Sequence, residues 1–351
     1  MRLEPEWSKI TFSKIDKILC ADNRARMENI VNLDLSVIMP VVISFGISVV
    51  LCPIIIPFLR KLKFGQFVRD DGPESHLKKA GTPTMGGLVI LVSILLTSLI
   101  YIRRYPDILP VLFMTLGFGI IGFLDDYIKV VMKRSLGLKP LQKMLGQFVV
   151  TAIFVYYYFD VAKMEATVSI PFVRGQVFLM PDWLFILFVF IVVLGTVNGV
   201  NFTDGLDGLA SGVTAIVATF FTVAALALNA DMTPITGAVV GSLLGFLLFN
   251  TYPARVFMGD TGSLALGGFV ASIALMLHMP LYIVIVGLIY LAEVLSVIAQ
   301  VTYFKLTHGK RIFKMAPIHH HFELSGFSET QVVAAFSILT AILCLVGLMG
   351  M

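Results

Sequence analysis

Long apolar runs follow one another along almost the whole chain, and they limit its possible folds more than any other feature. We place about ten of them, at residues 35–59, 85–102, 108–124, 144–159, 182–198, 209–228, 235–250, 264–279, 281–304 and 331–349. A helix needs roughly 20 apolar residues to cross a hydrocarbon layer about 30 Å thick. The sequence therefore predicts an all-α polytopic membrane protein, built as a bundle of about ten transmembrane helices.

Composition agrees with this prediction. Hydrophobic residues make up 58% of the chain and charged residues only 14%, against about 25% in soluble domains. The runs are unbroken, whereas the strands of an outer-membrane β-barrel alternate apolar and polar residues. The three cysteines show no paired spacing, and we assign them no chemistry. The segment 160–181, with Arg174 and Gly175 near its middle, predicts a small β-hairpin.

The distribution of lysine and arginine predicts the orientation of the bundle, because cytoplasmic loops of membrane proteins retain these residues. The loops after the first, third, fifth, seventh and ninth runs hold sixteen of the 26, whereas the loops on the other side hold four. We therefore expect the first group of loops in the cytoplasm and both termini on the periplasmic or extracellular side. The expected partner is the lipid bilayer and not nucleic acid.

The first residues of the chain do not fit this orientation. Six further lysines and arginines lie in the first 34 residues, which this orientation places on the periplasmic or extracellular side. Residues 1–26 are polar and end just before Met27, where an ordinary membrane-protein sequence could begin. We interpret residues 1–26 as an upstream extension or an expression remnant, and residues 27–351 as a single transmembrane domain.

Acidic residues gather at the predicted cytoplasmic ends of the helices. Six of them lie there, namely Asp125, Asp126, Asp204, Asp207, Asp260 and Glu323. One acidic residue in a loop is most often a solvated charge. Six at the border of the hydrocarbon need partners, since an uncompensated charge at mid-depth costs at least ~2.5 kcal/mol. We therefore expect an active site at the cytoplasmic face.

Two aspartate motifs carry the pattern. In "FLDDYIK", Asp125 and Lys129 share a helix face at i, i+4, which also suits a simple ion pair at a helix end. In "NFTDGLDGLA", Asn201, Asp204 and Asp207 are spaced three apart, which on a helix leaves them on one side. Capping of the next helix explains one of these aspartates, but not both together with Asn201.

Two further motifs suit metal and phosphate chemistry. "FMGDTGS" sets Asp260 in a glycine-rich turn, as a helix cap or as a ligand for Mg²⁺, which prefers carboxylate oxygens and leaves other positions to water and phosphates. "APIHHHFE" sets three histidines beside a basic loop. A shared zinc ion is the weaker interpretation, because successive side chains diverge and no cysteine or HExxH pattern accompanies them. We expect these imidazoles to hold phosphate oxygens.

Five motifs together resemble a known family. They are "SHLKKAGTPTMGG", "DDYIK", "NFTDGLDGL", "FMGDTGS" and "PIHHHFE", in this order between residues 75 and 323, and they closely resemble the bacterial phospho-N-acetylmuramoyl-pentapeptide transferases. The aspartate motifs are shared by the wider superfamily of polyprenyl-phosphate N-acetylhexosamine-1-phosphate transferases. "GTPTMGG" and "PIHHHFE" resemble the muramoyl-pentapeptide branch.

The resemblance implies a fold and a reaction. It implies a homodimer of ten-helix subunits in the bacterial cytoplasmic membrane, with Mg²⁺ as cofactor. The implied reaction moves phospho-N-acetylmuramoyl-pentapeptide from UDP-N-acetylmuramoyl-pentapeptide to undecaprenyl phosphate. Its products are lipid I, a precursor of peptidoglycan, and UMP.

The resemblance also implies roles for individual residues. The catalytic residues it implies are Asp125, Asp126, Lys129, Asp260 and His320, with Asp260 as the principal Mg²⁺ ligand. It implies a uridine nucleotide site at Asn201, Asp204, Gly205, Leu206, Asp207 and Asn250, with Phe257 stacking on uracil. Contacts to diphosphate, sugar or peptide are implied for Lys79, Thr84, Gln300, His319 and His321.

Two mechanisms are open for such a reaction. In the one we favour, the lipid phosphate attacks the β-phosphorus directly, and Asp125 or Asp126 orients it. The second pKa of a phosphate monoester is near 6, so little deprotonation remains at neutral pH. In the other, an aspartate forms a covalent phospho-enzyme.

Two other functions compete with this one. An ion-coupled transporter would carry acidic residues at mid-span on several helices, whereas only Glu293 lies deep in a predicted helix here. Within the superfamily, the alternative is a transferase that uses UDP-N-acetylglucosamine.

Overall fold

The computed structural model describes residues 37–61, 81–130, 132, 137–173 and 176–351, and the structural statements below refer to these residues. Within them, nine helices are long and apolar enough to cross a membrane, and Gly87–Tyr101 is a further, shorter apolar helix. Nine of the ten predicted runs fall on one of these helices each, and the run 281–304 covers α11 (Leu288–Leu306) and two short segments before it. The predicted polytopic helical bundle is confirmed, while residues 1–26 lie outside the described residues.

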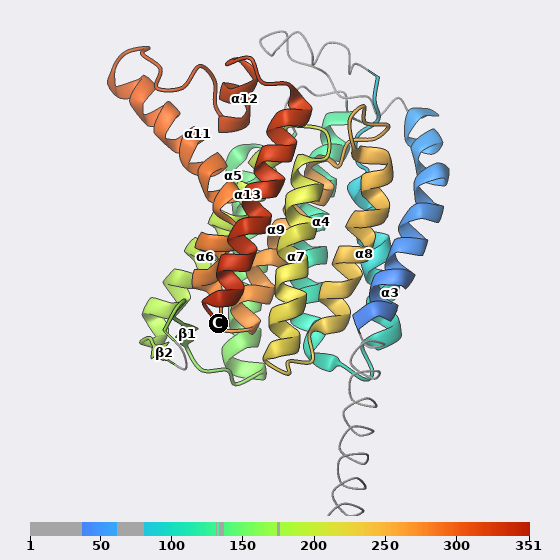
Figure 1. Cartoon of the computed structure of the whole chain (residues 1–351). Coiled ribbons are helices and arrows are strands. Elements are labelled where there is room, and N and C mark those ends of the chain that lie inside the picture. Colours follow the sequence, from blue (N-terminus) through green and yellow to red (C-terminus); the bar gives the residue numbers. More distant parts are fainter. Residues whose placement is uncertain (1–36, 62–80, 131, 133–136, 174–175) are drawn as a thin grey trace, which may run out of the picture.

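The helices stand side by side as one bundle (Figure 1). They are Val37–Lys61, α3 (Gly87–Tyr101), α4 (Leu109–Val130), α5 (Pro140–Tyr156), α6 (Asp182–Thr203), α7 (Leu209–Ala227), α8 (Thr233–Asn250), α9 (Gly259–Met276), α11 (Leu288–Leu306) and α13 (Glu329–Met349). Shorter segments connect them, namely η1 (Pro106–Ile108), η2 (Tyr157–Val161), η3 (Pro280–Tyr282), α10 (Ile283–Val286) and α12 (Ile318–Glu323).

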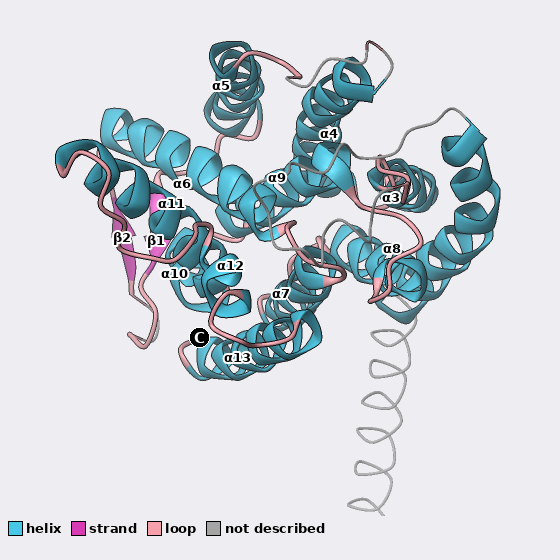
Figure 2. Cartoon of the chain, turned by 90° about the horizontal axis from the view of Figure 1, so that it is seen from above, coloured by secondary structure: helices cyan, strands magenta, loops and turns pink. Residues whose placement is uncertain are grey.

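Helix α9 lies at the centre of the bundle, while α5 stands at its rim (Figure 2). In the most apolar 18-residue stretch of α9, 89% is buried, compared with 22% in the corresponding stretch of the helix that begins with α5. Glycine, alanine and serine are frequent in α9, and such small residues let neighbouring backbones approach closely in a bilayer. The elements α4 and α6 both pack against it. A residue at the start of α9 is therefore within reach of several helices.

The approach of α4 to α9 depends on Gly122. A Cβ atom at this position would overlap the carbonyl oxygen of Asp260. Because Asp125 and Asp126 follow Gly122 by about one helical turn, they lie on the same side of α4 as the glycine. The close contact therefore brings the acidic end of α4 against the acidic start of α9.

Two helices extend further than hydropathy predicts. Helix α6 continues to Thr203 and α9 starts at Gly259, so Asn201 and Asp260 lie within helices and not in the predicted loops. Polar side chains in these turns hydrogen-bond one another, which offsets the cost of burying them near hydrocarbon. Hydropathy does not show that these polar side chains bond one another. The helix boundaries predicted from it therefore exclude these polar turns.

The predicted run 281–304 is wrong as a single helix. It consists of η3, α10 and α11, with Gly287 between the last two. Glycine in a helix interior costs about 1 kcal/mol relative to alanine, which favours a break at this position. Beyond it, α11 leans away from the other helices (Figure 1).

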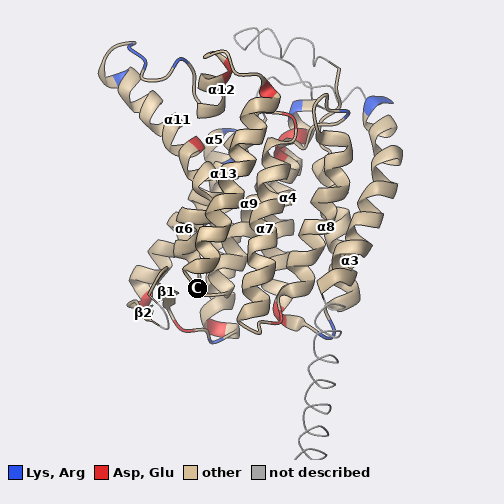
Figure 3. Ribbon diagram, in the orientation of Figure 1, with Lys and Arg blue, Asp and Glu red and all other residues tan. Residues whose placement is uncertain are grey.

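The predicted hairpin is confirmed. Strands β1 (Thr167–Ser169) and β2 (Val177–Leu179) pair in antiparallel fashion, with Thr167 opposite Leu179. Arg174 and Gly175 of the expected turn lie outside the described residues. The hairpin is at the end of the bundle opposite α12 (Figure 1). Charged residues lie mainly at these two ends of the ribbon, and few lie along the middle of the bundle (Figure 3).

Candidate active site

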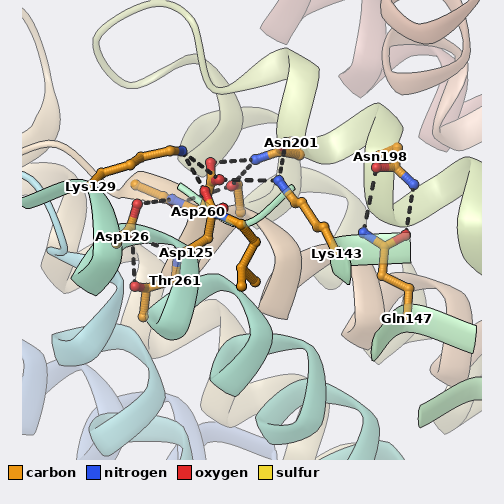
Figure 4. Close-up of polar contacts among 12 residues, drawn as sticks. Asp125, Asp126, Lys129, Lys143, Gln147, Asn198, Asn201, Asp260 and Thr261 are labelled. Carbon is orange, nitrogen blue, oxygen red and sulfur yellow. Dashed lines mark hydrogen bonds and ion pairs between the residues drawn. The ribbon is translucent and has the colours of Figure 1, made fainter. Parts of the chain in front are cut away.

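Three carboxylates converge where α4 meets α9 (Figure 4). Asp125 and Asp126 come from the C-terminal part of α4, and Asp260 comes from the first turn of α9. One oxygen atom from each of the three lies within 4.8 Å of the others. Asp125 and Asp126 are buried, and Asp260 is half-buried. Carboxylate oxygens grouped in this way fit a hard divalent cation such as Mg²⁺.

Two lysines reach one oxygen of Asp260 from different sides (Figure 4). The Nζ atom of Lys129 lies 2.9 Å from Asp260 Oδ2, and that of Lys143 lies 3.0 Å from the same atom. Lys129 also pairs with Asp125 at 2.5 Å, along the i, i+4 face. Three carboxylates and two ammonium groups leave one negative charge, which a single divalent cation would convert to one positive charge. That balance suits a diphosphate substrate.

Asp126 binds the start of α9. Its carboxylate accepts hydrogen bonds from the backbone N–H groups of Asp260 (3.2 Å) and Thr261 (2.9 Å) and from the Thr261 hydroxyl (2.7 Å). The first N–H groups of a helix have no partner within it, so Asp126 caps α9 from α4. Gly259 has a φ of +74°, and a Cβ atom there would lie 2.6 Å from Asp126 Oδ2. The glycine is therefore required for this cap.

Asn201 joins the same cluster from α6. Its Nδ2 group donates to Asp260 Oδ1 at 2.9 Å and to Ser263 Oγ at 2.8 Å. Its Oδ1 atom lies 3.3 Å from Lys143 Nζ. The resemblance groups Asn201 with the nucleotide, whereas the structure places its amide on the carboxylate that the metal would use.

Lys143 is the contact that the sequence did not predict. It lies near the start of α5, where the helix dipole disfavours a cation, and its side chain is 19% exposed. Its place near a helix N-terminus was the signal in the sequence, and only the structure adds that the lysine is half-buried and so needs an anion. One turn further along α5, Gln147 exchanges hydrogen bonds with Asn198 of α6 (Figure 4).

Residues 204–208 form a turn between α6 and α7, which we call the α6–α7 turn. Helix α6 ends at Thr203, so the prediction that Asn201, Asp204 and Asp207 lie on one side of a helix is wrong. Neither aspartate caps α7, whose N-cap residue is Gly208 at a φ of +79° with no side-chain cap. The carboxylate of Asp207 instead accepts the backbone N–H of Ala254 at 2.9 Å.

The other residues of the α6–α7 turn differ in exposure. Leu206 is buried, while Asp204 and Gly205 are half-buried. Burial, followed by the negative charges of Asp260 and Asp126, raises the pKa of the Asp204 carboxyl to about 8. A protonated carboxyl is therefore favoured at neutral pH until a cation compensates the cluster.

The raised pKa of Asp204 predicts how stability varies with pH when divalent cations are removed. The folded chain favours the protonated form, so this contribution is full below the ordinary pKa of 3.8 and is lost as pH rises through about 8. Asp204→Asn mimics the protonated carboxyl at every pH. Its melting temperature in detergent with EDTA should fall less than that of the wild type between about pH 6 and pH 9. Equal falls in the two proteins would contradict the shift.

The segment between α8 and α9, residues 251–258, is the α8–α9 loop. Asn250 is buried beside it, donating to the carbonyl of Val256 at 3.0 Å and accepting from the Ser211 hydroxyl at 2.6 Å. Its amide therefore connects the loop to Ser211 of α7. Phe257, which the resemblance assigns to uracil, is half-buried at the end of this loop.

The motif "GTPTMGG" lies against the α8–α9 loop. The backbone N–H of Phe257 donates to Pro83, and the carbonyl of Phe257 accepts from Gly86, both at 2.8 Å. Buried Thr84 lies within this pairing, and a Cβ atom on Gly259 would be 2.8 Å from its hydroxyl. Thr84 is thus adjacent to the carboxylate cluster, whereas Lys79 lies outside the described residues.

The three histidines occupy α12, a short helix where the sequence predicted a loop. Their Nδ1 atoms meet three different groups: the Glu293 carboxylate (3.0 Å from His319), the Glu323 carboxylate (2.8 Å from His320) and the backbone N–H of Lys314 (3.1 Å from His321). The three Nδ1 atoms thus have different partners, but the ring centroids of His319 and His320 lie only 4.1 Å apart, so the predicted divergence of successive side chains is wrong for this pair. Glu323 pairs with His320 and does not belong to the group formed by Asp125, Asp126 and Asp260.

His319 and Glu293 form a buried pair between α12 and α11. The two side chains are 1% and 0% exposed, and within the described part of the chain His319 Nε2 and Glu293 Oε2 have no hydrogen-bond partner. A Cβ atom on Gly205 would overlap His319 Nε2, so this ring lies directly against the α6–α7 turn. Gln300 of α11 binds the backbone of Ile312 and Phe313 and so holds the basic loop before α12.

Carboxylates and lysines gathered at one end of a polytopic bundle are typical of a membrane-embedded enzyme that acts on phosphate groups. Comparison with known proteins agrees. The family model for glycosyl transferase family 4 matches residues 108–278, and signature 1 of the phospho-N-acetylmuramoyl-pentapeptide-transferases matches residues 79–91.

Curated relatives match over nearly their whole length. The phospho-N-acetylmuramoyl-pentapeptide-transferase of Acetivibrio thermocellus is 51% identical over 308 residues, which are 87% of this chain and 92% of the relative. The enzyme of the same name from Alkaliphilus oremlandii is 52% identical over 321 residues (89% and 96%). That of Bacillus subtilis is 48% identical over 328 residues (90% and 98%). The chain belongs to the phospho-N-acetylmuramoyl-pentapeptide transferase family.

Proposed function

We propose that this chain transfers phospho-N-acetylmuramoyl-pentapeptide from UDP-N-acetylmuramoyl-pentapeptide to undecaprenyl phosphate, giving lipid I and UMP for peptidoglycan synthesis. The observation that carries the proposal is the convergence of Asp125, Asp126 and Asp260 with Lys129 and Lys143 at one end of a transmembrane bundle. A diphosphate needs positive charge, and a lipid acceptor needs a site at the membrane surface. The names of the relatives support phospho-N-acetylmuramoyl-pentapeptide as the transferred group, and undecaprenyl phosphate as acceptor is what the resemblance implies.

Mg²⁺ fits the donor set, which consists of carboxylate oxygens close to one another. We assign Asp260 as its principal ligand, with Asp125 and Asp126 beside it. When bound, the cation supplies neutralisation of charge on the phosphate oxygens. The choice of Asp260 as principal ligand is what the family resemblance implies, and the carboxylate donors and net negative charge of the cluster support a cation beside it.

In a direct attack by the lipid phosphate, the lysines and aspartates of the cluster have different roles. An oxygen of the lipid phosphate forms a bond to the β-phosphorus, the bond from that phosphorus to the α-phosphate oxygen breaks, and UMP leaves with the electron pair. Lys129 and Lys143 stabilise the charge on the phosphates. Asp126 caps α9, and Asp125 accepts the backbone N–H of Leu138 at 2.7 Å. We assign the orientation of the attacking oxygen to Asp125, because it is the one that pairs with half-exposed Lys129.

The nucleotide site is proposed at the α6–α7 turn. Asp204, Gly205 and Asp207 lie there, and Asp207 connects the turn to the loop that ends in Phe257. His319 of α12 borders the turn, and the ring centroid of His320 lies 4.1 Å from that of His319. We further propose a homodimer in the bacterial cytoplasmic membrane with this end of the bundle in the cytoplasm, as the lysine and arginine distribution predicts.

An assay of the purified protein with undecaprenyl phosphate, Mg²⁺ and either UDP-sugar tests the function. We expect UMP release with UDP-N-acetylmuramoyl-pentapeptide and none with UDP-N-acetylglucosamine; the reverse would indicate the other branch of the superfamily. Release with neither substrate would refute the proposal. The same assay with β-phosphorus-labelled substrate, no lipid and rapid quenching tests direct attack, because labelled protein formed at the rate of turnover would indicate a phospho-aspartyl intermediate.

A further inference from the structure

Glu329 is a buried carboxylate to which the proposed chemistry gives no task. It is the first residue of α13, and 9% of its surface is exposed. A buried carboxylate is costly unless hydrogen bonds compensate it. Its Oε1 atom accepts the backbone N–H of Asp207 at 2.6 Å, across 122 residues of sequence. The start of the last helix is thus bonded directly to the α6–α7 turn.

The start of α13 does not itself require this carboxylate. Ser328 is the N-cap residue, and its hydroxyl accepts the backbone N–H of Gln331. The Gln331 side chain in turn accepts the backbone N–H of Ser328 at 2.8 Å. This reciprocal pair is a complete capping box, which satisfies two of the orphan backbone donors locally. The position of Glu329 is therefore better explained by its long-range bond.

The bond to Asp207 extends to the rest of the proposed nucleotide site. Asp207 uses its backbone N–H for Glu329 and its carboxylate for the backbone N–H of Ala254 in the α8–α9 loop. Three residues further along that loop is Phe257. One chain of hydrogen bonds thus connects α13, the α6–α7 turn and the loop that carries Phe257.

The negative charge of Glu329 lies close to those of two other acidic residues. The α6–α7 turn already holds Asp204 and Asp207, and a third acidic side chain beside them adds repulsion. A charged acceptor gives a shorter and stronger hydrogen bond than a neutral one. The N–H that Glu329 accepts belongs to Asp207, two residues before α7 begins, and negative charge is favoured near a helix N-terminus. The strong hydrogen bond from the Asp207 N–H therefore fixes the α6–α7 turn in spite of the repulsion between the three acidic side chains.

We infer that Glu329 is a positioning residue for the nucleotide subsite, which holds the α6–α7 turn in the geometry that receives the uridine moiety. The inference rests on the proposed function for the identity of the nucleotide. It makes nucleotide affinity depend on a side chain of the last helix. Affinity for the lipid phosphate, which binds at the carboxylate cluster, should not depend on Glu329.

The test compares Glu329→Ala and Glu329→Gln with the wild type in the full-length protein. Glu329→Ala should raise the KM for UDP-N-acetylmuramoyl-pentapeptide and the Kd for UMP at least about tenfold, since a hydrogen bond to a charged group is lost. Glu329→Gln keeps an acceptor oxygen and should recover most of this loss. The KM for undecaprenyl phosphate should stay within about twofold in both variants.

Gln331→Ala is the matched control, because it opens the capping box in the same helical turn without touching Asp207. It should change neither KM. The inference is overturned if Glu329→Ala leaves nucleotide binding unchanged, if it raises both KM values equally, or if Gln331→Ala has the same effect. If Glu329→Ala does not fold, Glu329→Asp, which is one methylene shorter, takes its place in the comparison. UMP binding is measured without turnover, so it decides this inference even if the proposed reaction is not observed.

Discussion

Replacing Asp260 with alanine should lower the rate of UMP release by roughly 10³-fold at saturating substrate and Mg²⁺. Asp260 is the only described residue to which Lys129, Lys143 and Asn201 all bond. Its loss would remove the proposed principal metal ligand and leave two ammonium groups without their shared carboxylate. Both effects act on the charge that develops on the phosphates. Steady-state kinetics with a Mg²⁺ titration measures the loss.

The control for this variant is Ser263→Ala, one turn further along α9. Ser263 shares the partner Asn201 with Asp260 but offers no carboxylate, so its replacement should leave activity within about threefold. Melting temperature and gel filtration should show that both variants are folded. Near-normal turnover of a folded Asp260→Ala protein would exclude Asp260 from the metal site.

Local parts of the site were accessible from sequence. The Asp125–Lys129 pair follows from the geometry of one helix, and its spacing of four residues predicted it. By contrast, the contact of Lys143 with Asp260 joins residues 117 apart, and it depends on how closely α4, α5 and α9 pack. Gly122 controls part of that packing, yet in the sequence it is one glycine among 29.

Glu293 shows why a charge within a predicted helix needs the structure to interpret it. In the sequence it was the single deep acidic residue and the only feature that favoured a transporter. In the structure it pairs with His319, which itself lies against Gly205. The partner is supplied by α12, a helix too short for any hydropathy pattern to reveal. What looked like a membrane-embedded charge belongs to the framework of the active-site end.

Replacing Lys143 with methionine should lower kcat/KM for UDP-N-acetylmuramoyl-pentapeptide by about 100-fold, which corresponds to about 2.7 kcal/mol of transition-state stabilisation. Methionine keeps much of the apolar stem and removes only the ammonium group. That group lies 3.0 Å from Asp260 and is 19% exposed, so water screens its charge poorly. Lys143→Arg keeps the charge and should lose less activity.

Lys139→Met provides the matched control, because it removes the same charge from the start of the same helix. Lys139 is exposed, and solvent screens charges at such positions, so its replacement should change kcat/KM by less than about twofold. Equal losses in the two variants would mean that the basic surface attracts the substrate in general. A loss confined to Lys143→Met would place this ammonium group at the reacting phosphates, because only a charge held close to them can distinguish two lysines four residues apart.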